Sequence, residues 1–259
     1  MSIVGDRYVV AGKLSEGWLD AVRLVFGVSS KKIVHLVVRI TEPNVEDVAV
    51  RDAAQQLIDS WNASHRNTSR EMEHIETTRN TIFPASFARR TNGPDDLASY
   101  YRQRLTKDGL LGFTHNARGT YFGRIVAYPR GDGEQTADQL SDTVRKLRAE
   151  LSHRSSKSSR YEISIYNERL DRSPMSFPCL AHLSMHLHDR RLHLQAVYRN
   201  EYLVGRAYGN FLGLAQLQSY VAGAVGLNVG ELMITAGHAE LDGSKASTAA
   251  MLQRLQRQP

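Results

Sequence analysis

Three residues whose side chains could act on a substrate stand at short intervals in the last third of the chain. Cys179 is the only cysteine in 259 residues, so it cannot form a disulfide within the chain. Arg199 follows twenty residues later, and Asn210 eleven residues after that. A thiol, a guanidinium and an amide suit a small anionic substrate with a planar polar ring. The alternative for Cys179 is a buried thiol that packs as a small hydrophobic side chain.

The chain around these residues predicts a β-hairpin followed by a helix. Residues 178–188 alternate apolar and polar side chains, 189–191 predict a turn, and 191–200 alternate again. An apolar helix over Asn210–Val225 follows, and Gly226 is its stop signal. The cysteine is therefore expected at the head of the hairpin and the arginine at its far end. Asn210 could also serve as the N-cap of the helix, although its side-chain oxygen can fill only one of the two roles.

The rest of the chain intermixes helical and extended patterns, which indicates an α/β (α+β) fold around one sheet. We predict helices over Glu16–Phe26, Val45–Trp61, Pro94–Leu105, Ala137–Leu151 and Lys245–Gln256. We predict strands over Lys32–Ile40, Tyr121–Ala127, 160–166 and Leu227–Thr235. Residues 62–80 are polar and predict a flexible connection.

Composition restricts the class of protein. A chain of this length with 41% hydrophobic content can bury a full core. The sequence has no eighteen-residue apolar run and no signal-peptide pattern, so we expect a cytoplasmic protein that does not enter a membrane. The net charge is +6, with basic residues clustered over 145–160. Because no aromatic stacking motif or zinc-finger spacing accompanies them, nucleic acid is not the expected partner.

Residues 160–242 resemble the core of the thymidylate synthase family, which includes the pyrimidine hydroxymethylases. FPCLAHLSMHL is similar to the Pro-Cys nucleophile strand of that family, and LHLQAVYRNEYLVGRAYGN to its phosphate-binding strand and the turn that follows. SRYEISIYNERLD resembles its arginine–strand–asparagine segment, and the likeness runs without gaps from Arg160 to Asp242. GTYFGRIVAY resembles a further substrate-contacting segment, in which Phe122 is the candidate residue.

The resemblance implies a single domain over residues 1–259 with a mixed β-sheet covered by helices, one face of which forms a homodimer interface. It implies that the Cys179 thiolate adds to carbon 6 of a pyrimidine nucleoside monophosphate, which makes carbon 5 nucleophilic. Arg199 would favour the thiolate and hold the phosphate. Asn210 would bind the base, and its amide matches the N3–H and O4 of uracil.

Other matched positions carry different residue types from those of the family. Tyr198 and Asn200 flank Arg199, where the family has glutamine and serine. Glu240 and Asp242 stand where a histidine and a tyrosine hold the sugar hydroxyl. A carboxylate can accept two hydrogen bonds, so we predict a preference for ribonucleotides. The alternative is that both carboxylates face solvent at the end of a strand.

Two features of the family would come from outside this nucleotide pocket. Arg160 matches an arginine that reaches the phosphate of the partner subunit, although Ser159 replaces its usual companion. The alternative is that Arg160 belongs to a solvated basic loop. The resemblance also implies 5,10-methylenetetrahydrofolate as the one-carbon donor, but the pterin-binding aspartate is Tyr202 here. Glu42 and Glu46 are candidates for a glutamate that orders water at the base.

Histidines concentrate on the predicted hairpin. His182, His186 and His188 share one face of a strand, and His193 lies across the turn. Neighbours two apart on one face of a strand lie about 6.5–7 Å apart, close enough for two imidazoles to bind one metal ion. No cysteine or carboxylate of fixed spacing completes a ligand set. We therefore expect sheet or interface histidines and no metal site.

Two hypotheses on function follow. The first is an enzyme that transfers a methyl or hydroxymethyl group to carbon 5 of a pyrimidine nucleoside monophosphate through Cys179. The second is a binding or regulatory protein that keeps the nucleotide pocket and has lost folate chemistry. Cys179, Arg199 and Asn210 favour the first, whereas Tyr202 favours the second.

Overall fold

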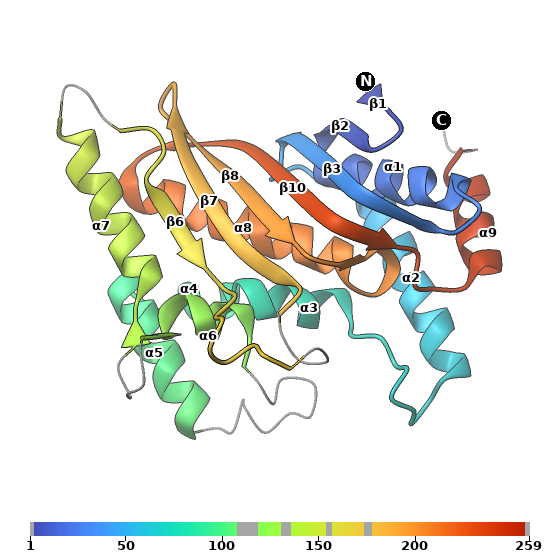
Figure 1. Cartoon of the computed structure of the whole chain (residues 1–259), viewed down its shortest axis with the longest axis horizontal. Coiled ribbons are helices and arrows are strands. Elements are labelled where there is room, and N and C mark those ends of the chain that lie inside the picture. The colour runs from blue at the N-terminus through green and yellow to red at the C-terminus, as the bar shows by residue number, and fades with distance from the viewer. Residues whose placement is uncertain (1–2, 108–118, 131–135, 154–156, 174–177, 257–259) are drawn as a thin grey trace. The chain divides into compact units, whose positions relative to one another are not determined.

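The computed structural model describes residues 3–107, 119–130, 136–153, 157–173 and 178–256. The chain forms two compact units. Unit 1 comprises residues 1–79, 198–215 and 231–259, and unit 2 comprises 80–197 and 216–230. Strand β10 (Asn228–Glu240) and helix α8 (Tyr208–Val225) have residues in both. Figure 1 shows the course of the chain.

Unit 1 contains one edge of a mixed sheet and the helices that pack on it. Its strand order is β1-β2-β3-β10, and β9 pairs with the end of β10. Strand β2 runs parallel to β3, whereas β10 runs antiparallel to β3. The strands are β1 (Ile3–Val4), β2 (Tyr8–Lys13), β3 (Lys32–Glu42) and β9 (Glu201–Tyr202). The helices are α1 (Leu14–Gly27), α2 (Val48–Ser64), the π-helix η3 (Leu203–Ala207), the start of α8, and α9 (Lys245–Gln256).

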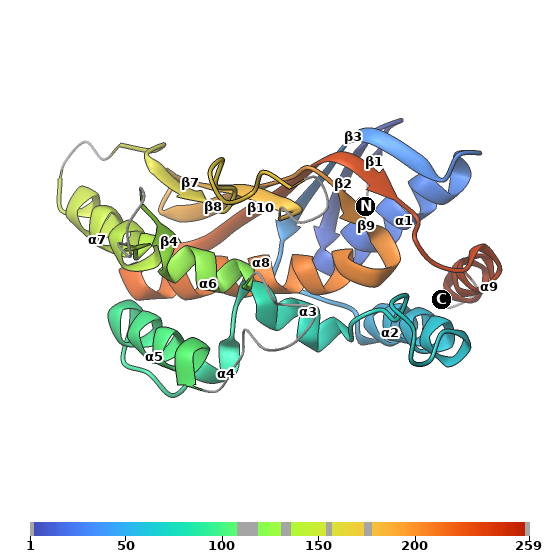
Figure 2. The ribbon, with the colours of Figure 1, turned by 60° about the horizontal axis from the view of Figure 1, so that its bottom comes forward.

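Helix α1 packs closely on β2 and β3 and supports the segment that follows β9 (Figure 2). Gly17 permits this approach, because a Cβ there would lie 2.9 Å from Cγ1 of Ile40. Trp18 is fully buried, and its Nε1 donates a hydrogen bond of 2.7 Å to the carbonyl of Leu203. The Trp18 ring also packs edge-on against Tyr208 at 5.3 Å. These contacts fix η3 and the start of α8 against the sheet.

Unit 2 contains the hairpin and a group of helices beside it. Its strand order is β10-β8-β7-β6. The elements are β6 (Tyr161–Ser164), β7 (Leu180–His188), β8 (Arg191–Tyr198), the small pair β4 (Tyr128–Pro129) and β5 (Thr136–Ala137), α4 (Ala85–Ala88), α5 (Pro94–Lys107), α6 (Tyr121–Val126) and α7 (Gln139–Leu151). Helix α3 (Ile75–Ile82) has residues in both units. Asp189 and Arg190 both have positive φ, which is typical of a two-residue hairpin turn.

The predicted α/β (α+β) class, a mixed sheet covered by helices, is confirmed. The hairpin and all six predicted helices are present, with small shifts at their ends. The single-domain extent and the dimer interface stay predictions. In the part of the chain described here, no helix combines the length and the apolar content that crossing a membrane needs.

Two predicted elements are wrong. The expected strand over Tyr121–Ala127 is helix α6. Thr120 caps it by accepting a 3.0 Å hydrogen bond from the Gly123 N–H, and the apolar residues at positions 122, 125 and 126 are buried on one helical face. Residues 62–80 are not one flexible connection, since α2 reaches Ser64 and α3 begins at Ile75. Asn62 bridges that segment by bonding both the N–H and the carbonyl of Met72 at 2.8 Å.

Candidate functional site

The candidate site in unit 1 lies where β8 ends, β9 and η3 follow, and α8 begins. Its centre is a pair of buried polar side chains, Glu201 on β9 and Asn210 in the first turn of α8, which are 2% and 3% exposed. The Asn210 Nδ2 donates a hydrogen bond of 2.9 Å to Oε1 of Glu201. Oε2 of Glu201 and Oδ1 of Asn210 are also buried, and neither has a partner among the residues that the structure describes. Orphan polar atoms of this kind are rare in protein interiors and mark places where a ligand, water or proton completes the bonding.

Asn210 does not cap the helix, so that alternative is wrong. Helix α8 begins at Tyr208 and continues directly from η3. The N-cap position of this continuous helical segment is Tyr202, which precedes η3. Asn210 is therefore inside the helix, with its side chain directed to Glu201 instead of to a backbone N–H. A π-helix inserted before an α-helix is uncommon and is often found at functional sites.

Glu201 holds a proton near neutral pH. The pKa of its carboxyl is raised from 4.5 to about 8, chiefly by burial and to a smaller extent by the charge of Asp242. The Asn210 hydrogen bond and the charge of Arg206 act in the opposite direction. A protonated carboxyl has one O–H donor in addition to its acceptor oxygens.

Asp242 binds the backbone at the start of η3. Its two oxygens accept hydrogen bonds from the N–H groups of Val204 and Gly205, at 2.8 and 3.0 Å. A Cβ at position 205 would lie 2.7 Å from Oδ2 of Asp242, so glycine permits this approach. Burial raises the pKa of Asp242 to about 6. Glu240 forms an ion pair of 3.1 Å with Lys32. The Asp242 and Glu240 carboxylates therefore both have partners within the protein.

The residues that flank Arg199 are held by β10. Tyr198 is buried, whereas Arg199 has an exposed side chain. The Arg199 carbonyl accepts a hydrogen bond of 3.1 Å from the N–H of His238, and Asn200 Oδ1 lies 2.8 Å from the His238 Nδ1. The backbone at Arg199 is therefore held by β10, and the residue is exposed.

Glu46 is the better placed of the two candidate glutamates. Its Oε2 accepts a hydrogen bond of 3.1 Å from the hydroxyl of Tyr208, and its Oε1 accepts one of 2.9 Å from Arg51. Burial and the Glu46 carboxylate raise the pKa of Tyr208. Tyr208 lies two residues before Asn210 in the same helix turn. Glu42 is an exposed residue at the end of β3.

The remaining predicted site residues belong to unit 2. Cys179 is half-buried and stands directly before β7. Phe122 is wholly buried in α6, where it packs edge-on against Tyr101 and Phe83, which is the environment of a core residue. Arg160 forms an ion pair of 2.5 Å with Glu150. Its role toward a partner subunit stays a prediction.

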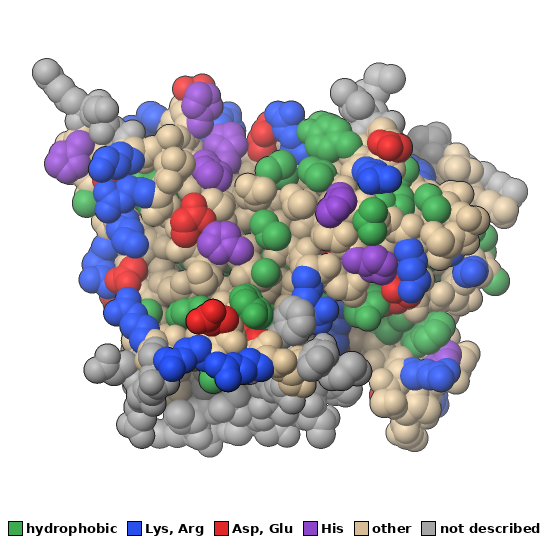
Figure 3. All heavy atoms as spheres, in the orientation of Figure 1, with side chains coloured by type: hydrophobic (Ala, Val, Ile, Leu, Met, Phe, Trp, Pro, Cys, Tyr) green, Lys and Arg blue, Asp and Glu red, His purple; other side chains and the backbone are tan. Residues whose placement is uncertain are grey.

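The histidines of β7 belong to a polar row on the exposed face of the sheet (Figure 3). His182 lies 2.5 Å from a carboxylate oxygen of Glu162, whose other oxygen accepts a bond of 2.7 Å from Ser184. Ser184 also lies 3.1 Å from His186. Within the described ranges, no three residues of the ligand types are grouped so as to hold a metal ion.

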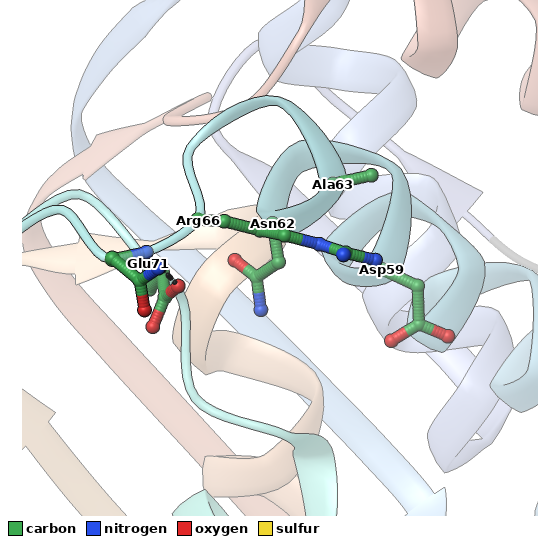
Figure 4. Close-up of a pocket in the computed structure, with 6 residues that line it drawn as sticks. Asp59, Asn62, Ala63, Arg66 and Glu71 are labelled. Atoms are coloured by element: carbon green, nitrogen blue, oxygen red, sulfur yellow. Dashed lines mark hydrogen bonds between the residues drawn. The ribbon is translucent and has the colours of Figure 1, made fainter.

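An open pocket of about 430 Å³ lies elsewhere in unit 1, at the end of α2 (Figure 4). Its polar lining includes Asp59, Asn62, Arg66 and Glu71. None of the residues selected from the sequence lines this pocket, and Glu71 already accepts a hydrogen bond from the Asn67 N–H.

Comparison with known proteins decides the family. The family model described as thymidylate synthase matches residues 46–259. The chain belongs to the thymidylate synthase family. Two relatives are both named "Putative thymidylate synthase". The one from Methanothermobacter thermautotrophicus is 29% identical over 140 residues, which cover 54% of this chain and 56% of the relative.

The second relative, from Methanothermobacter marburgensis, is 25% identical over 134 residues, which cover 52% of this chain and 53% of the relative. The chain spans about half the length of the curated relatives it matches. Proteins of the thymidylate synthase family act on pyrimidine nucleotides, and methylenetetrahydrofolate is their usual one-carbon donor.

The residues present do not fit that donor at the pterin position. Tyr202 stands where the thymidylate synthase family has an aspartate, and it is 40% exposed beside the start of η3. A carboxylate accepts hydrogen bonds at two oxygens, whereas a phenol has one O–H. Tyr202 therefore lacks the paired acceptor oxygens of that aspartate.

Glu201 was not predicted from the sequence. An acidic residue between Arg199-Asn200 and Tyr202 resembles any exposed residue in a turn, and nothing in its spacing indicates burial. The parallel pairing of β9 with β10, which sets Glu201 opposite Ala239, brings the carboxyl inside. Only the three-dimensional arrangement identifies it as the partner of Asn210.

Proposed function

We propose that this chain is a divergent thymidylate synthase-family enzyme that transfers a one-carbon unit to carbon 5 of a pyrimidine nucleoside monophosphate. The observation that carries the proposal is the buried Asn210–Glu201 pair with its two orphan polar atoms, in a chain of this family. A buried amide that retains hydrogen-bonding capacity suits the polar edge of a planar base. The exposed guanidinium of Arg199, on a backbone fixed by β10, suits a phosphate group.

Cys179 is the proposed nucleophile. Its thiolate adds to carbon 6, the Sγ–C6 bond forms, and the electron pair of the C5–C6 double bond moves to carbon 5 and O4. Carbon 5 then takes an electrophile or a proton. Loss of a proton from carbon 5 and departure of the thiolate restore the ring. The half-buried position of Cys179 directly before β7 supports this assignment, as does its register with Arg199 and Asn210 in the family motif.

The sugar and the partner subunit have less specific candidates. Glu240 and Asp242 are proposed near the sugar, where an acceptor would favour a ribonucleotide diol. Asp242 already bonds two backbone N–H groups, so Glu240 is the carboxylate with more capacity to contribute. Arg160 is proposed to reach the phosphate of a partner subunit in a homodimer, and Tyr198 and Asn200 to shape the surroundings of Arg199.

Tyr202 favours a second candidate function. A chain that binds pyrimidine nucleotides without the family's folate contacts could act as a nucleotide-binding or regulatory protein. This candidate keeps Arg199 and Asn210 as ligand contacts and gives Cys179 no chemical role.

Exchange of the base hydrogen separates the two functions without a folate. The protein is incubated in D₂O with UMP or dUMP, and the H5 signal of the ring is followed by proton NMR. The enzyme proposal expects H5 to be replaced by deuterium, because carbon 5 of the Cys179 adduct takes a deuteron from solvent. Cys179→Ala should bind the nucleotide and exchange nothing. Binding without exchange by the unaltered chain would overturn the enzyme and favour the binding protein, and no binding would overturn both.

A further inference from the structure

We infer that Glu201 is a positioning residue that holds the Asn210 amide through a shared proton, and that the protonated form of this pair is the one that takes a pyrimidine nucleotide. The inference rests on the proposed function, and it concerns a residue outside the family motif of cysteine, arginine and asparagine.

The backbone of both residues is fixed before any ligand arrives. Glu201 lies on β9 and pairs in parallel register with Ala239 of β10. Asn210 lies within α8, where the preceding Gly209 fits so closely that a Cβ would be 2.7 Å from the carbonyl of Ile75. Neither side chain can move away by a small backbone shift. The 2.9 Å bond between Nδ2 and Oε1 is thus a rigid feature of unit 1.

A single proton accounts for both orphan atoms. A carboxylic acid and a primary amide are complementary, since the amide N–H donates to one carboxyl oxygen and the carboxyl O–H can donate to the amide oxygen. With the proton on Oε2, the two buried atoms that lack partners among the described residues become a donor and an acceptor. Without the proton, two acceptors are buried together and one of them carries negative charge. Such an arrangement is costly at 2% exposure.

The surrounding charges oppose ionisation. Burial raises the pKa of Glu201 most and the Asp242 carboxylate raises it further, whereas the Asn210 hydrogen bond and Arg206 lower it, and the result is about 8. Asp242 arrives from the segment after β10, Arg206 from η3 and Asn210 from α8, so these groups face Glu201 from each neighbouring element. The carboxyl is therefore neutral at pH 7 and ionises just above it.

When Glu201 and Asn210 are joined by both of these hydrogen bonds, the Asn210 amide keeps one N–H and one lone pair for a ligand. The two point to opposite sides of the amide, so each can bond one polar atom of a planar base, the N–H a carbonyl and the lone pair a ring N–H. Ionisation of Glu201 adds a buried negative charge beside a site that receives an anionic nucleotide, and it removes the donor that steadies Oδ1. Nucleotide binding should therefore weaken as Glu201 loses its proton.

Isothermal titration of UMP and dUMP at pH 7, 8 and 9 tests the inference, using the full chain and Glu201→Gln. Glutamine reproduces the neutral acid, with one oxygen to accept and one N–H to donate, and cannot ionise. The unaltered chain should lose affinity by about tenfold per pH unit above the pKa of Glu201, since one proton is linked to binding. Glu201→Gln should keep its pH 7 affinity to within about threefold at pH 9. Asp20→Asn changes another buried carboxyl of unit 1 and should follow the unaltered chain.

The outcomes are distinct. The same pH profile in the unaltered chain and in Glu201→Gln would overturn the inference while leaving the proposed function in place. No binding of either nucleotide by either protein at pH 7 would overturn the proposed function, and the inference with it. If Glu201→Gln does not fold, titration of the unaltered chain at pH 8.5 in two buffers of different ionisation enthalpy gives the proton uptake directly. Uptake of a proton on binding supports the inference, and no uptake overturns it.

Discussion

The two units each contain a buried carboxyl next to an asparagine, and the two clusters differ in how completely they are bonded. In unit 2, Asp171 accepts both arms of Arg124, at 2.6 and 2.8 Å, and the N–H of Asn167 at 2.8 Å. Arg124 also donates to the carbonyl of Ile165. In unit 1, Glu201 has one bond, from Asn210, and each residue keeps a buried atom without a partner among the described residues.

The difference separates a structural role from a binding role. A saturated cluster has no hydrogen-bonding capacity left for a ligand. The hydrogen bonds between Arg124 and Asp171 instead hold α6 to the chain after β6. An unsaturated cluster costs stability in the isolated chain and regains it when a ligand or a proton completes the bonds. Burial alone therefore does not indicate a binding site, and unmet hydrogen-bonding capacity is the additional property that supports the proposed one.

Removing the Asp171 carboxylate from the saturated cluster should have the largest effect, a fall in the free energy of unfolding. Asp171→Ala leaves the guanidinium of Arg124, whose side chain is 14% exposed, without its counter-charge. We expect the free energy of unfolding to fall by about 3–5 kcal/mol, because an uncompensated charge stays buried. Urea denaturation of both proteins measures the change. A loss below about 1 kcal/mol would show that this cluster does not stabilise unit 2.

Arg199→Ala should weaken binding without weakening the fold. We expect the affinity for UMP or dUMP to fall by about 2–4 kcal/mol, because a charge-assisted bidentate contact is lost. Uridine, which has no phosphate, should bind weakly and equally to both proteins. Calorimetric titration with nucleotide and nucleoside gives the two comparisons, and an unchanged affinity for the monophosphate would contradict the assignment of Arg199.

Replacing the carboxyl of the unsaturated cluster should stabilise the chain at high pH. The pKa of Glu201 is raised from 4.5 to about 8 on folding, so its contribution to stability is fully present below pH 4.5 and is lost as the pH rises to 8. Glu201→Gln removes that loss. We expect the variant to exceed the unaltered chain by about 3–4 kcal/mol at pH 8.5 relative to the difference at pH 5. Denaturant unfolding at both pH values provides the test, and a difference independent of pH would refute the raised pKa.

The smallest change in the free energy of unfolding is expected for a substitution on the exposed face of the sheet. Glu162 and His182 form a close pair, but their side chains are 45% and 36% exposed. Glu162→Gln should therefore change the free energy of unfolding by no more than about 1 kcal/mol. The same urea experiment as for Asp171→Ala makes the comparison. A change as large as that of Asp171→Ala would mean that hydrogen bonding on this face matters as much as burial.

The sequence was sufficient to predict the class of fold and the residues of the family motif. Alternation over 178–200 predicted the hairpin because strand periodicity is a local property, and the Lys245–Gln256 helix has the predicted limits. Helix α6 was missed because its six residues are apolar and aromatic, and a short apolar segment does not distinguish a strand from a helix.

The hydrogen-bond partners of the polar side chains at the candidate site could not be predicted from the sequence, since they depend on contacts between distant segments. The bond from Tyr208 to Glu46 joins residues 162 positions apart, and that from Val204 to Asp242 joins residues 38 apart. Asn210 was selected from its spacing, whereas the partner of its side chain, Glu201, depended on β9 pairing with β10. Sequence spacing indicated which residues could bind a ligand. Only the fold distinguished Asn167, in the saturated cluster, from Asn210, in the unsaturated one.

The most direct test of this contrast follows the side-chain amides of Asn210 and Asn167 by ¹H–¹⁵N NMR while UMP or dUMP is added, with assignments from Asn210→Ser and Asn167→Ser. Binding at the unsaturated cluster predicts that the Asn210 amide signals move in proportion to nucleotide occupancy while those of Asn167 stay in place. Movement of the Asn167 signals alone, or stationary Asn210 signals at a nucleotide concentration that saturates binding, would contradict the assignment of the binding role to the Glu201–Asn210 pair.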